Sequence, residues 1–306
     1  MKYLPSEVPL VISQDSDNQE VSSLIKEYER ALHIKHHPRE SIHKKSGGEP
    51  DSYYYISSHY KFGLQHVFDR LLFDAVIIIE DDMEISPDFF DYFISLYSVL
   101  KYDDTLFCVS AWNDNGQSPF VKNADVIYRS DFFPGLGWML TRDFWDEIKN
   151  KWPGAYWDDW LREPDQRKDR DCIRPEISRT YTFGKEGSSM GQFYDKYLAN
   201  IKLNKEKVNW GSKDLSFLNK DTYDKEFDKE IDSCTEISEI QDIDSYQNKK
   251  LLLYYADQNS FTHMADRLEI MSDHKAGVPR TGYSTRRHKD CVTFWKNSNQ
   301  IFMCQR

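Results

Sequence analysis

A run of apolar residues that ends in three consecutive acids, residues 74–82 (DAVIIIEDD), constrains the fold more than any other stretch. Five apolar residues, four of them β-branched, predict a short strand buried on both faces. Unpaired carboxylates are costly to bury, so Glu80, Asp81 and Asp82 are expected where the strand leaves the sheet. Ligands of open α/β sheets bind at the carboxyl ends of strands, so this position predicts a binding site.

An acidic triplet at a strand end has two interpretations. Carboxylate oxygens are hard ligands that suit Mn²⁺ or Mg²⁺, especially when the metal is shared with a phosphate group. The same residues could instead form a solvated acidic turn that does no more than end the strand. The triplet alone does not decide between a metal site and a turn.

Strands and helices alternate in the first part of the chain, which is the pattern of an α/β fold with a parallel sheet. A strand is expected over 8–13, and Asn18 suits the N-cap of a helix with apolar residues on one face. Residues 36–50 are expected to form a polar loop, and residues 56–71 a second helix. The apolar face of the first helix would consist of Val21, Leu24, Ile25 and Tyr28.

After the acids, Ser86 and Pro87 suit the N-cap and first position of a third helix. Residues 181–192 are polar and contain three glycines, the composition of a mobile lid. Residues 221–245 are strongly acidic and predict either an exposed, partly helical connector or the edge of a second domain. Further elements are expected at 106–112 (strand), 141–148 (helix), 251–255 (strand), 261–271 (helix) and 292–302 (small sheet).

The composition excludes some classes of function. A net charge of −11 and a pI near 5.3 argue against a nucleic-acid-binding protein, which needs a basic footprint. No apolar run approaches the ~18–20 residues that span a bilayer, and residues 1–8 lack the apolar core of a signal peptide. The five cysteines fit one or two disulfides with a free thiol, or buried thiols, and none forms a C-x-x-C zinc motif.

A second acidic cluster, Asp158-Asp159, lies between Trp157 and Trp160, which would partly bury the two carboxylates. The aromatic and glycine-rich turn at 131–138 could form a platform for a sugar ring. The combination indicates metal-assisted transfer from a nucleotide sugar, with one acidic cluster holding the metal and the other supplying a general base. The tryptophans are equally consistent with core positions, and these are Trp112, Trp138, Trp157 and Trp160.

Segments along nearly the whole chain resemble the N-acetylglucosaminyltransferase I family. They are residues 80–90 (EDDMEISPDFF), 109–116 (VSAWNDNG), 131–138 (DFFPGLGW), 157–162 (WDDWLR) and 172–180 (CIRPEISRT). The resemblance implies an α/β fold, with a Rossmann-like nucleotide-sugar transferase domain of the GT-A type and a smaller C-terminal domain.

The implied activity is that of an inverting, Mn²⁺-dependent enzyme that moves GlcNAc from UDP-GlcNAc in β1,2 linkage to a mannose of a high-mannose N-glycan. This step initiates hybrid and complex N-glycan synthesis. One alternative is an O-mannose β1,2-GlcNAc-transferase, which shares the acidic triplet and the Gly-Leu-Gly-Trp turn, although 131–133 and 157–160 match the N-glycan enzyme better. Another is a non-catalytic paralogue or fragment that binds a glycan or a partner transferase.

The resemblance also implies roles for single residues. Asp82 corresponds to the direct Mn²⁺ ligand, and Glu80 and Asp81 to groups that hold the ribose, the donor sugar and the metal's water shell. Asp158 corresponds to the general base, whereas Asp159 is expected to be structural. The other expected donor contacts are Asp15 and His59 at the uracil end, Leu136 beside the donor sugar and Ser189 in a loop that orders over the donor.

Two of these donor contacts have simpler alternatives, and two arginines and two cysteines are expected to have structural roles. His59 could be a core histidine, and Ser189 an ordinary loop serine. Arg174 and Arg179 are expected to balance buried acids rather than to contact phosphate. Cys108 and Cys172 match a disulfide of the family.

The family places a cytoplasmic tail, a membrane anchor, a stem and a first βα unit ahead of the matching region, and this chain is expected to lack them. The implied location is the Golgi lumen, as a type II membrane protein whose anchor is absent here. The expected domains are a catalytic domain over 1–184 without its first βα unit, a donor-ordered lid and connector over 185–221, and a small C-terminal domain over 222–306.

Overall fold

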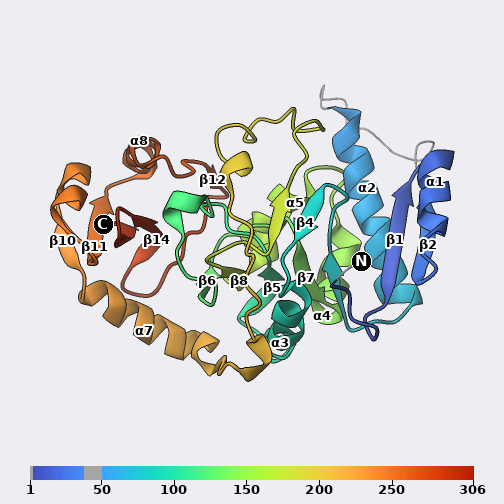
Figure 1. Cartoon of the computed structure of the whole chain (residues 1–306), viewed down its shortest axis with the longest axis horizontal. Coiled ribbons are helices and arrows are strands. Elements are labelled where there is room, and N and C mark those ends of the chain that lie inside the picture. The colour runs from blue at the N-terminus through green and yellow to red at the C-terminus, as the bar shows by residue number, and fades with distance from the viewer. Residues whose placement is uncertain (1–2, 38–49) are drawn as a thin grey trace. The chain divides into compact units, whose positions relative to one another are not determined.

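The computed structural model describes residues 3–37 and 50–306, which form a mixed α/β fold (Figure 1). The chain divides into two compact units, each described here by itself. Unit 1 consists of Met1–Val76 and Thr141–Trp160, and unit 2 of Ile77–Leu140 and Leu161–Arg306. The domain limits expected at residues 184 and 221 stay a prediction. Within the described residues, none of the helices combines the length and apolar character that crossing a membrane requires.

Unit 1 contains a parallel pair of strands, β1 (Leu10–Asp15) and β2 (Ala31–His36), connected by α1 (Gln19–Lys26). Asn18 caps α1 as predicted, because its side-chain oxygen accepts hydrogen bonds from the backbone N–H groups of Glu20 and Val21. Strand β2 is not predicted from the sequence, since its apolar residues are few and two histidines interrupt them. Most of the loop predicted over 36–50 lies outside the described residues.

The apolar face predicted for the first helix is mostly exposed. Val21, Leu24 and Tyr28 are 41%, 54% and 40% exposed, whereas Ile25 is buried. An eight-residue helix beside a two-stranded sheet can bury only one narrow row of side chains, which explains the difference. The other helices of unit 1 are α2 (Asp51–Gln65), which continues into a π-helical turn at His66–Arg70, α4 (Arg142–Ile148) and α5 (Trp157–Arg162).

A five-stranded sheet with the order β3-β7-β5-β8-β6 underlies unit 2. Its strands are β3 (Ala75–Ile78), β5 (Leu106–Ser110), β6 (Ile127–Ser130), β7 (Trp138–Thr141) and β8 (Asp171–Pro175). The sheet is mixed rather than parallel, because β5 pairs parallel to β8 but antiparallel to β7. The double-sided burial predicted for 75–79 is also wrong, since β3 is an edge strand whose residues are only half-buried. The fully buried strands of this sheet are β5 and β8.

A second, four-stranded sheet forms the C-terminal part of unit 2, in the order β10-β11-β15-β14. Ile301 and Met303 belong to a core with Phe261 of α8, while Phe302 contacts Phe227 of α7 on the opposite face. Helix α7 is therefore a packed element, so the exposed connector, one of the two interpretations of 221–245, is wrong, while the edge of a second domain stays a prediction. The elements are α7 (Lys220–Asp232), β10 (Thr235–Ile237), β11 (Lys250–Tyr255), α8 (Gln258–Leu268), β14 (Lys289–Lys296) and β15 (Asn299–Gln305).

Shorter elements complete unit 2. An antiparallel pair joins β4 (Met83–Ile85) to β9 (Thr180–Thr182), and a second joins β12 (His274–Lys275) to β13 (Val278–Pro279). The remaining α-helices are α3 (Phe89–Tyr102) and α6 (Pro164–Arg167). Single 3₁₀ segments lie at Ser118–Phe120, Leu198–Asn200, Trp210–Ser212, Ser216–Leu218 and Ile240–Ser245, with another in unit 1 at Lys149–Lys151.

Asp88, which is fully buried, organises the start of α3. Its Oδ2 accepts hydrogen bonds from Arg179 Nη2 at 3.1 Å and Trp210 Nε1 at 2.8 Å. Its Oδ1 accepts from Ser86 Oγ at 2.7 Å and Asn204 Nδ2 at 2.9 Å. Ser86 therefore bonds to Asp88 and does not cap α3, which begins at Phe89, so the predicted N-cap is wrong. Arg179 balances a buried acid, as predicted.

We expect Asp88→Ala to lower the free energy of unfolding by about 3–5 kcal/mol, because it would leave the Arg179 guanidinium buried without its counter-ion. Chemical denaturation measures this change. Lys205→Ala is the matched control, since the Lys205–Glu84 pair is 70% and 57% exposed and exposed pairs contribute under about 1 kcal/mol. Similar small losses for both variants would contradict the assigned role of Asp88.

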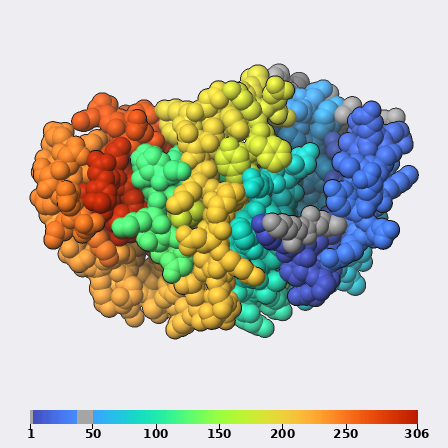
Figure 2. Space-filling model, viewed as in Figure 1, coloured from blue at the N-terminus to red at the C-terminus, as the bar shows by residue number. Residues whose placement is uncertain are grey.

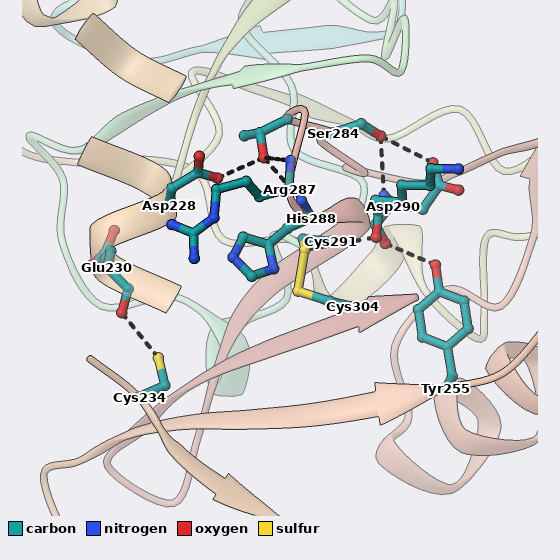
Figure 3. Close-up of a disulfide and its surroundings, with 12 residues drawn as sticks. Asp228, Glu230, Cys234, Tyr255, Ser284, Arg287, His288, Asp290, Cys291 and Cys304 are labelled. Carbon is teal, nitrogen blue, oxygen red and sulfur yellow. Dashed lines mark hydrogen bonds between the residues drawn. A yellow bond between two sulfur atoms is a disulfide. The ribbon is translucent and has the colours of Figure 1, made fainter. Parts of the chain in front are cut away.

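Two disulfides lie in unit 2. Cys108–Cys172 joins β5 to β8 across their parallel pairing, which confirms the predicted pair. Cys291–Cys304 joins β14 to β15 (Figure 3). Cys234 is a free thiol whose Sγ donates to the backbone oxygen of Glu230 at 3.3 Å. Two disulfides and a free thiol match the first interpretation of the five cysteines.

Removing the Cys108–Cys172 disulfide by a double alanine substitution is expected to lower stability by about 4 kcal/mol, the chain-entropy value for a separation of 64 residues. Mass spectrometry of non-reduced, proteolysed protein should recover the two linked peptides. Free thiols at both positions in the secreted protein would contradict the pairing.

Candidate active site

Asp82 lies in the turn between β3 and β4 and is half-buried. Thr182 Oγ1 donates to Asp82 Oδ2 at 3.3 Å, whereas Asp82 Oδ1 is buried and has no hydrogen-bond partner. Burial, followed by the neighbouring charge of Asp81, raises the pKa of the Asp82 carboxyl. A cation beside Oδ1 would compensate for the burial and for the missing partner, so this carboxylate fits a divalent metal.

Glu80 and Asp81 are exposed on the same turn. Among the described residues, no group of three or more His, Cys, Asp or Glu side chains gathers around a common point to hold a metal.

Because Gly184 has no side chain, the Asp82 carboxylate can lie in the space where a side chain at residue 184 would be. A Cβ atom added to Gly184 would lie 1.8 Å from Asp82 Oδ2, far inside van der Waals contact. The chain is fixed here because the Phe183 N–H donates to the Asp82 backbone oxygen at 3.0 Å. Glycine is required at residue 184 for reasons of space, and its φ lies outside the left-handed region.

The turn that contains Leu136 is tied to the same part of unit 2. Thr180 Oγ1 donates to the Leu136 backbone oxygen at 2.6 Å, and Thr180 lies on β9 together with Thr182. Side chains two residues apart in a strand share a face, so Thr180 holds the Leu136 turn while Thr182 holds Asp82. Gly137, at φ +89°, allows this approach, because a Cβ there would lie 2.6 Å from Thr180 Cγ2.

Ser189 is exposed in a segment of consecutive turns on the surface of unit 2 (Figure 2). Its backbone hydrogen bonds include short-range ones, from Met190 N to Gly187 O and from Gln192 N to Ser189 O. The Arg280 guanidinium lies 5.9 Å from the centroid of the Phe193 ring. Met190 is 90% exposed. Short-range backbone bonds and exposed side chains lower the free-energy cost of local opening.

We expect residues 185–195 to exchange amide hydrogens rapidly in the free protein and slowly with UDP-GlcNAc and Mn²⁺, because the donor would supply the missing contacts. Hydrogen-exchange mass spectrometry measures this difference, with the buried strand β5 as the internal control. Equal exchange in 185–195 with and without the donor would contradict a lid.

In unit 1, the structure brings Asp15 and His59 into one cluster through His36. Asp15 Oδ1 bonds to His36 Nδ1 at 2.9 Å, and the His36 ring stacks on that of His59 with centroids 5.4 Å apart. His59 Nε2 shares a hydrogen bond with Ser13 Oγ at 2.7 Å. The cluster combines flat rings with a carboxylate that is 29% exposed, which suits a planar heterocycle.

Asp158 and Asp159 are half-buried in the first turn of α5, where the helix dipole favours negative charge. Trp157 precedes them and is buried between other rings, stacking on Tyr60 at 4.1 Å and on Trp152 at 6.0 Å. Trp157 is therefore a core residue that fixes the start of α5. Trp112 and Trp138 are also core residues, with exposures of 0% and 1%.

The family assignment rests on the whole length of the chain. A family model described as the GNT-I family matches residues 1–305. The chain belongs to the GNT-I family. A curated relative, the alpha-1,3-mannosyl-glycoprotein 2-beta-N-acetylglucosaminyltransferase of Arabidopsis thaliana, is 46% identical over 280 residues, which cover 91% of this chain and 63% of the relative. This GNT-I chain thus spans less than two-thirds of that relative's length.

The sequence of this GNT-I chain does not predict two residues that shape the candidate site, His36 and Gly184. His36 links Asp15 to His59, and it could have been found only by recognising β2, whose register pairs Asp15 with His36. Gly184 looks like an ordinary glycine of a mobile segment, and only the position of the Asp82 carboxylate shows why it is needed.

Proposed function

We propose that this GNT-I chain is the catalytic part of an inverting transferase that moves GlcNAc from UDP-GlcNAc to a mannose of a high-mannose N-glycan in β1,2 linkage. The observation that carries the proposal is Asp82, a half-buried carboxylate at the end of an edge strand with an oxygen that lacks a partner. The Arabidopsis relative is named as a transferase of N-acetylglucosamine to a mannosyl glycoprotein, which supports the choice of sugar and acceptor. We also propose a Rossmann-like domain of the GT-A type as the setting of the site.

Each residue then has a defined task. Asp82 would hold Mn²⁺, and Glu80 and Asp81 would hold the ribose, the donor sugar and the water shell of the metal. When bound, the metal would neutralise the negative charge that develops on the leaving diphosphate. The donor-binding residues of the other elements are Asp15 and His59 for the uracil, Leu136 for the GlcNAc ring and Ser189 for the cover over the donor.

Asp158 takes the proton from the 2-hydroxyl of the acceptor mannose. The hydroxyl oxygen attacks the anomeric carbon from the face opposite UDP and forms the new C–O bond. The bond from the anomeric carbon to the diphosphate oxygen breaks, and its electron pair leaves with UDP. One displacement inverts the anomeric configuration, so an α-linked donor gives a β-linked product.

The Golgi lumen is the proposed location, with a type II anchor in the whole protein. Two disulfides favour an oxidising compartment, since cytosolic thiols are kept reduced. Immunofluorescence of the full-length protein with a Golgi marker tests the location, and a diffuse cytosolic signal would contradict it.

A transfer assay tests the proposed activity. The full-length protein is incubated with radiolabelled UDP-GlcNAc, Mn²⁺ and either an oligomannose N-glycan or an O-mannosyl peptide. We expect transfer to the N-glycan, in a β1,2 linkage that NMR of the product identifies. Transfer only to the peptide would identify an O-mannose enzyme, and transfer to neither would favour a non-catalytic paralogue; either result overturns the proposal.

A further inference from the structure

A groove of about 300 Å³ lies in unit 2 between α7, the end of the β14–β15 hairpin and the edge strand β6. We call it the α7–β14 groove, and its wall and rim include Tyr128, Phe217, Phe227, Glu230, Trp295 and Gln300. Trp295 on β14 and Gln300 on β15 are direct cross-strand partners, so their side chains project from the same face of the sheet. Glu226 and Glu230 on α7 are four residues apart and share a face of the helix.

Several polar groups of this groove lack protein partners. Trp295 Nε1 is buried and donates no hydrogen bond, although a buried indole N–H ordinarily finds an acceptor. Within residues 3–37 and 50–306, the side-chain amides of Gln300 and Asn123 make no hydrogen bond to other side chains or to backbone. The groove therefore offers donors and acceptors that the protein itself does not use.

The groove also contains aromatic surface and charged groups of both signs. Phe217 is 40% exposed and Trp295 is half-buried, so both rings are partly open to a ligand. Glu226 and Glu230 each accept a hydrogen bond from a lysine on Oε1, at 2.6 Å. The Lys122 ammonium lies 4.7 Å from the centroid of the Trp295 ring. Because the carboxylates are paired and a cation is also present, the groove favours a neutral ligand over a strongly charged one.

We propose that the α7–β14 groove binds a neutral sugar ring of a glycan. A sugar has an apolar C–H face that packs on Phe217 or Trp295 and hydroxyl groups that both donate and accept hydrogen bonds. The hydroxyls satisfy the side-chain amides of Asn123 and Gln300, which both donate and accept hydrogen bonds. An ammonium ligand gains less, because lysines already pair with the carboxylates of Glu226 and Glu230.

This inference goes beyond the proposed transfer reaction, because binding at the groove needs neither donor nor metal. Trp295 belongs to the strand pair that the Cys291–Cys304 disulfide joins, and Glu230 belongs to the neighbouring helix α7 (Figure 3). The groove is thus built on packed elements, which favours binding without a rearrangement of the backbone.

The test follows the indole N–H of Trp295 by NMR in protein labelled with ¹⁵N-tryptophan, with the signal assigned by its loss in Trp295→Phe. Methyl α-D-mannopyranoside and N-acetylglucosamine are titrated separately, without UDP-GlcNAc or Mn²⁺. We expect at least one of the two to move the Trp295 signal in a saturable way, with a millimolar dissociation constant. Phe217→Ala should weaken the affinity about tenfold, as expected for the loss of one aromatic contact.

Tyr102→Ala is the matched control, since Tyr102 is 79% exposed and does not line this groove. Asp82→Ala should leave the sugar affinity unchanged, so this test stands even if the transfer reaction is not found. A Trp295 signal that neither sugar moves would overturn the proposal. A signal that moves with N-acetyl-lysine amide but with neither sugar would overturn it as well, in favour of a cation site.

Discussion

Gly184→Ala is expected to weaken Mn²⁺-dependent UDP binding about 10–100-fold, the usual effect of disturbing a group that orients a metal ligand. The added methyl group would occupy the space of Asp82 Oδ2, which lies 1.8 Å from the position of the new Cβ. Asp82 would have to turn away, and its hydrogen bond from Thr182 would be lost. Asp82→Ala, which removes the carboxylate, should abolish Mn²⁺-dependent binding altogether.

Isothermal calorimetry of UDP binding, with and without Mn²⁺, measures both effects. Gly211→Ala is the matched control, because the nearest atom to a Cβ at residue 211 is Asn209 Oδ1 at 3.8 Å, an ordinary contact, and its φ lies outside the left-handed region. Both site variants should unfold at the same denaturant concentration as the unchanged protein, since Asp82 lies at a strand end and not in the core. Unaltered UDP–Mn²⁺ binding by Asp82→Ala would refute the metal assignment.

The central acidic stretch shows both how much could be predicted from the sequence and where prediction stopped. The β-branched run correctly predicted a strand followed by a turn of acids at residues 80–82. Burial of that strand was overestimated, because apolar composition does not reveal whether a strand has one neighbour or two. The position of β3 at the sheet edge depends on pairings with β7, which is more than 50 residues away in sequence.

Sequence patterns predict a helix cap correctly where the stabilising hydrogen bonds join residues that are close in sequence. The Asn18 cap was predicted because its partners are two and three residues away. The Ser86 cap failed because Asp88, which is two residues away, is held by Arg179, Asn204 and Trp210 from a distant segment. Long-range partners of this kind override local propensity, and a single sequence does not show them.

The same distinction applies to the candidate site. The acidic residues of the candidate site could be recognised from the sequence, because their type and spacing indicate their chemistry. The residues that position these acids could not be recognised. Thr182 and Gly184 contact Asp82, and His36 contacts Asp15, only in the folded structure. The C-terminal part of unit 2 shows a related effect, because α7 is acidic overall but buries Tyr223, Phe227 and Ile231 on one face.

Asp158→Asn is expected to lower kcat for GlcNAc transfer by about 10²–10⁴-fold, the usual contribution of a general base. The amide keeps the shape of the side chain but cannot accept the proton of the acceptor hydroxyl. Proton removal belongs to the transition state, so the affinity for UDP-GlcNAc should remain nearly unchanged. The pair Asp158 and Asp159 lies in one turn of α5, which makes Asp159→Asn the matched control.

Steady-state kinetics and calorimetry of the donor, carried out on both variants, separate the two residues. Asp159→Asn should retain most of its kcat and should change mainly the denaturation midpoint, because its role is expected to be structural. If Asp159→Asn lost transfer while Asp158→Asn kept it, the two roles would have to be exchanged. If neither substitution slowed transfer, the base would lie elsewhere, and the buried ring stack of Trp157, Tyr60 and Trp152 would serve to hold α5 in place without positioning a base.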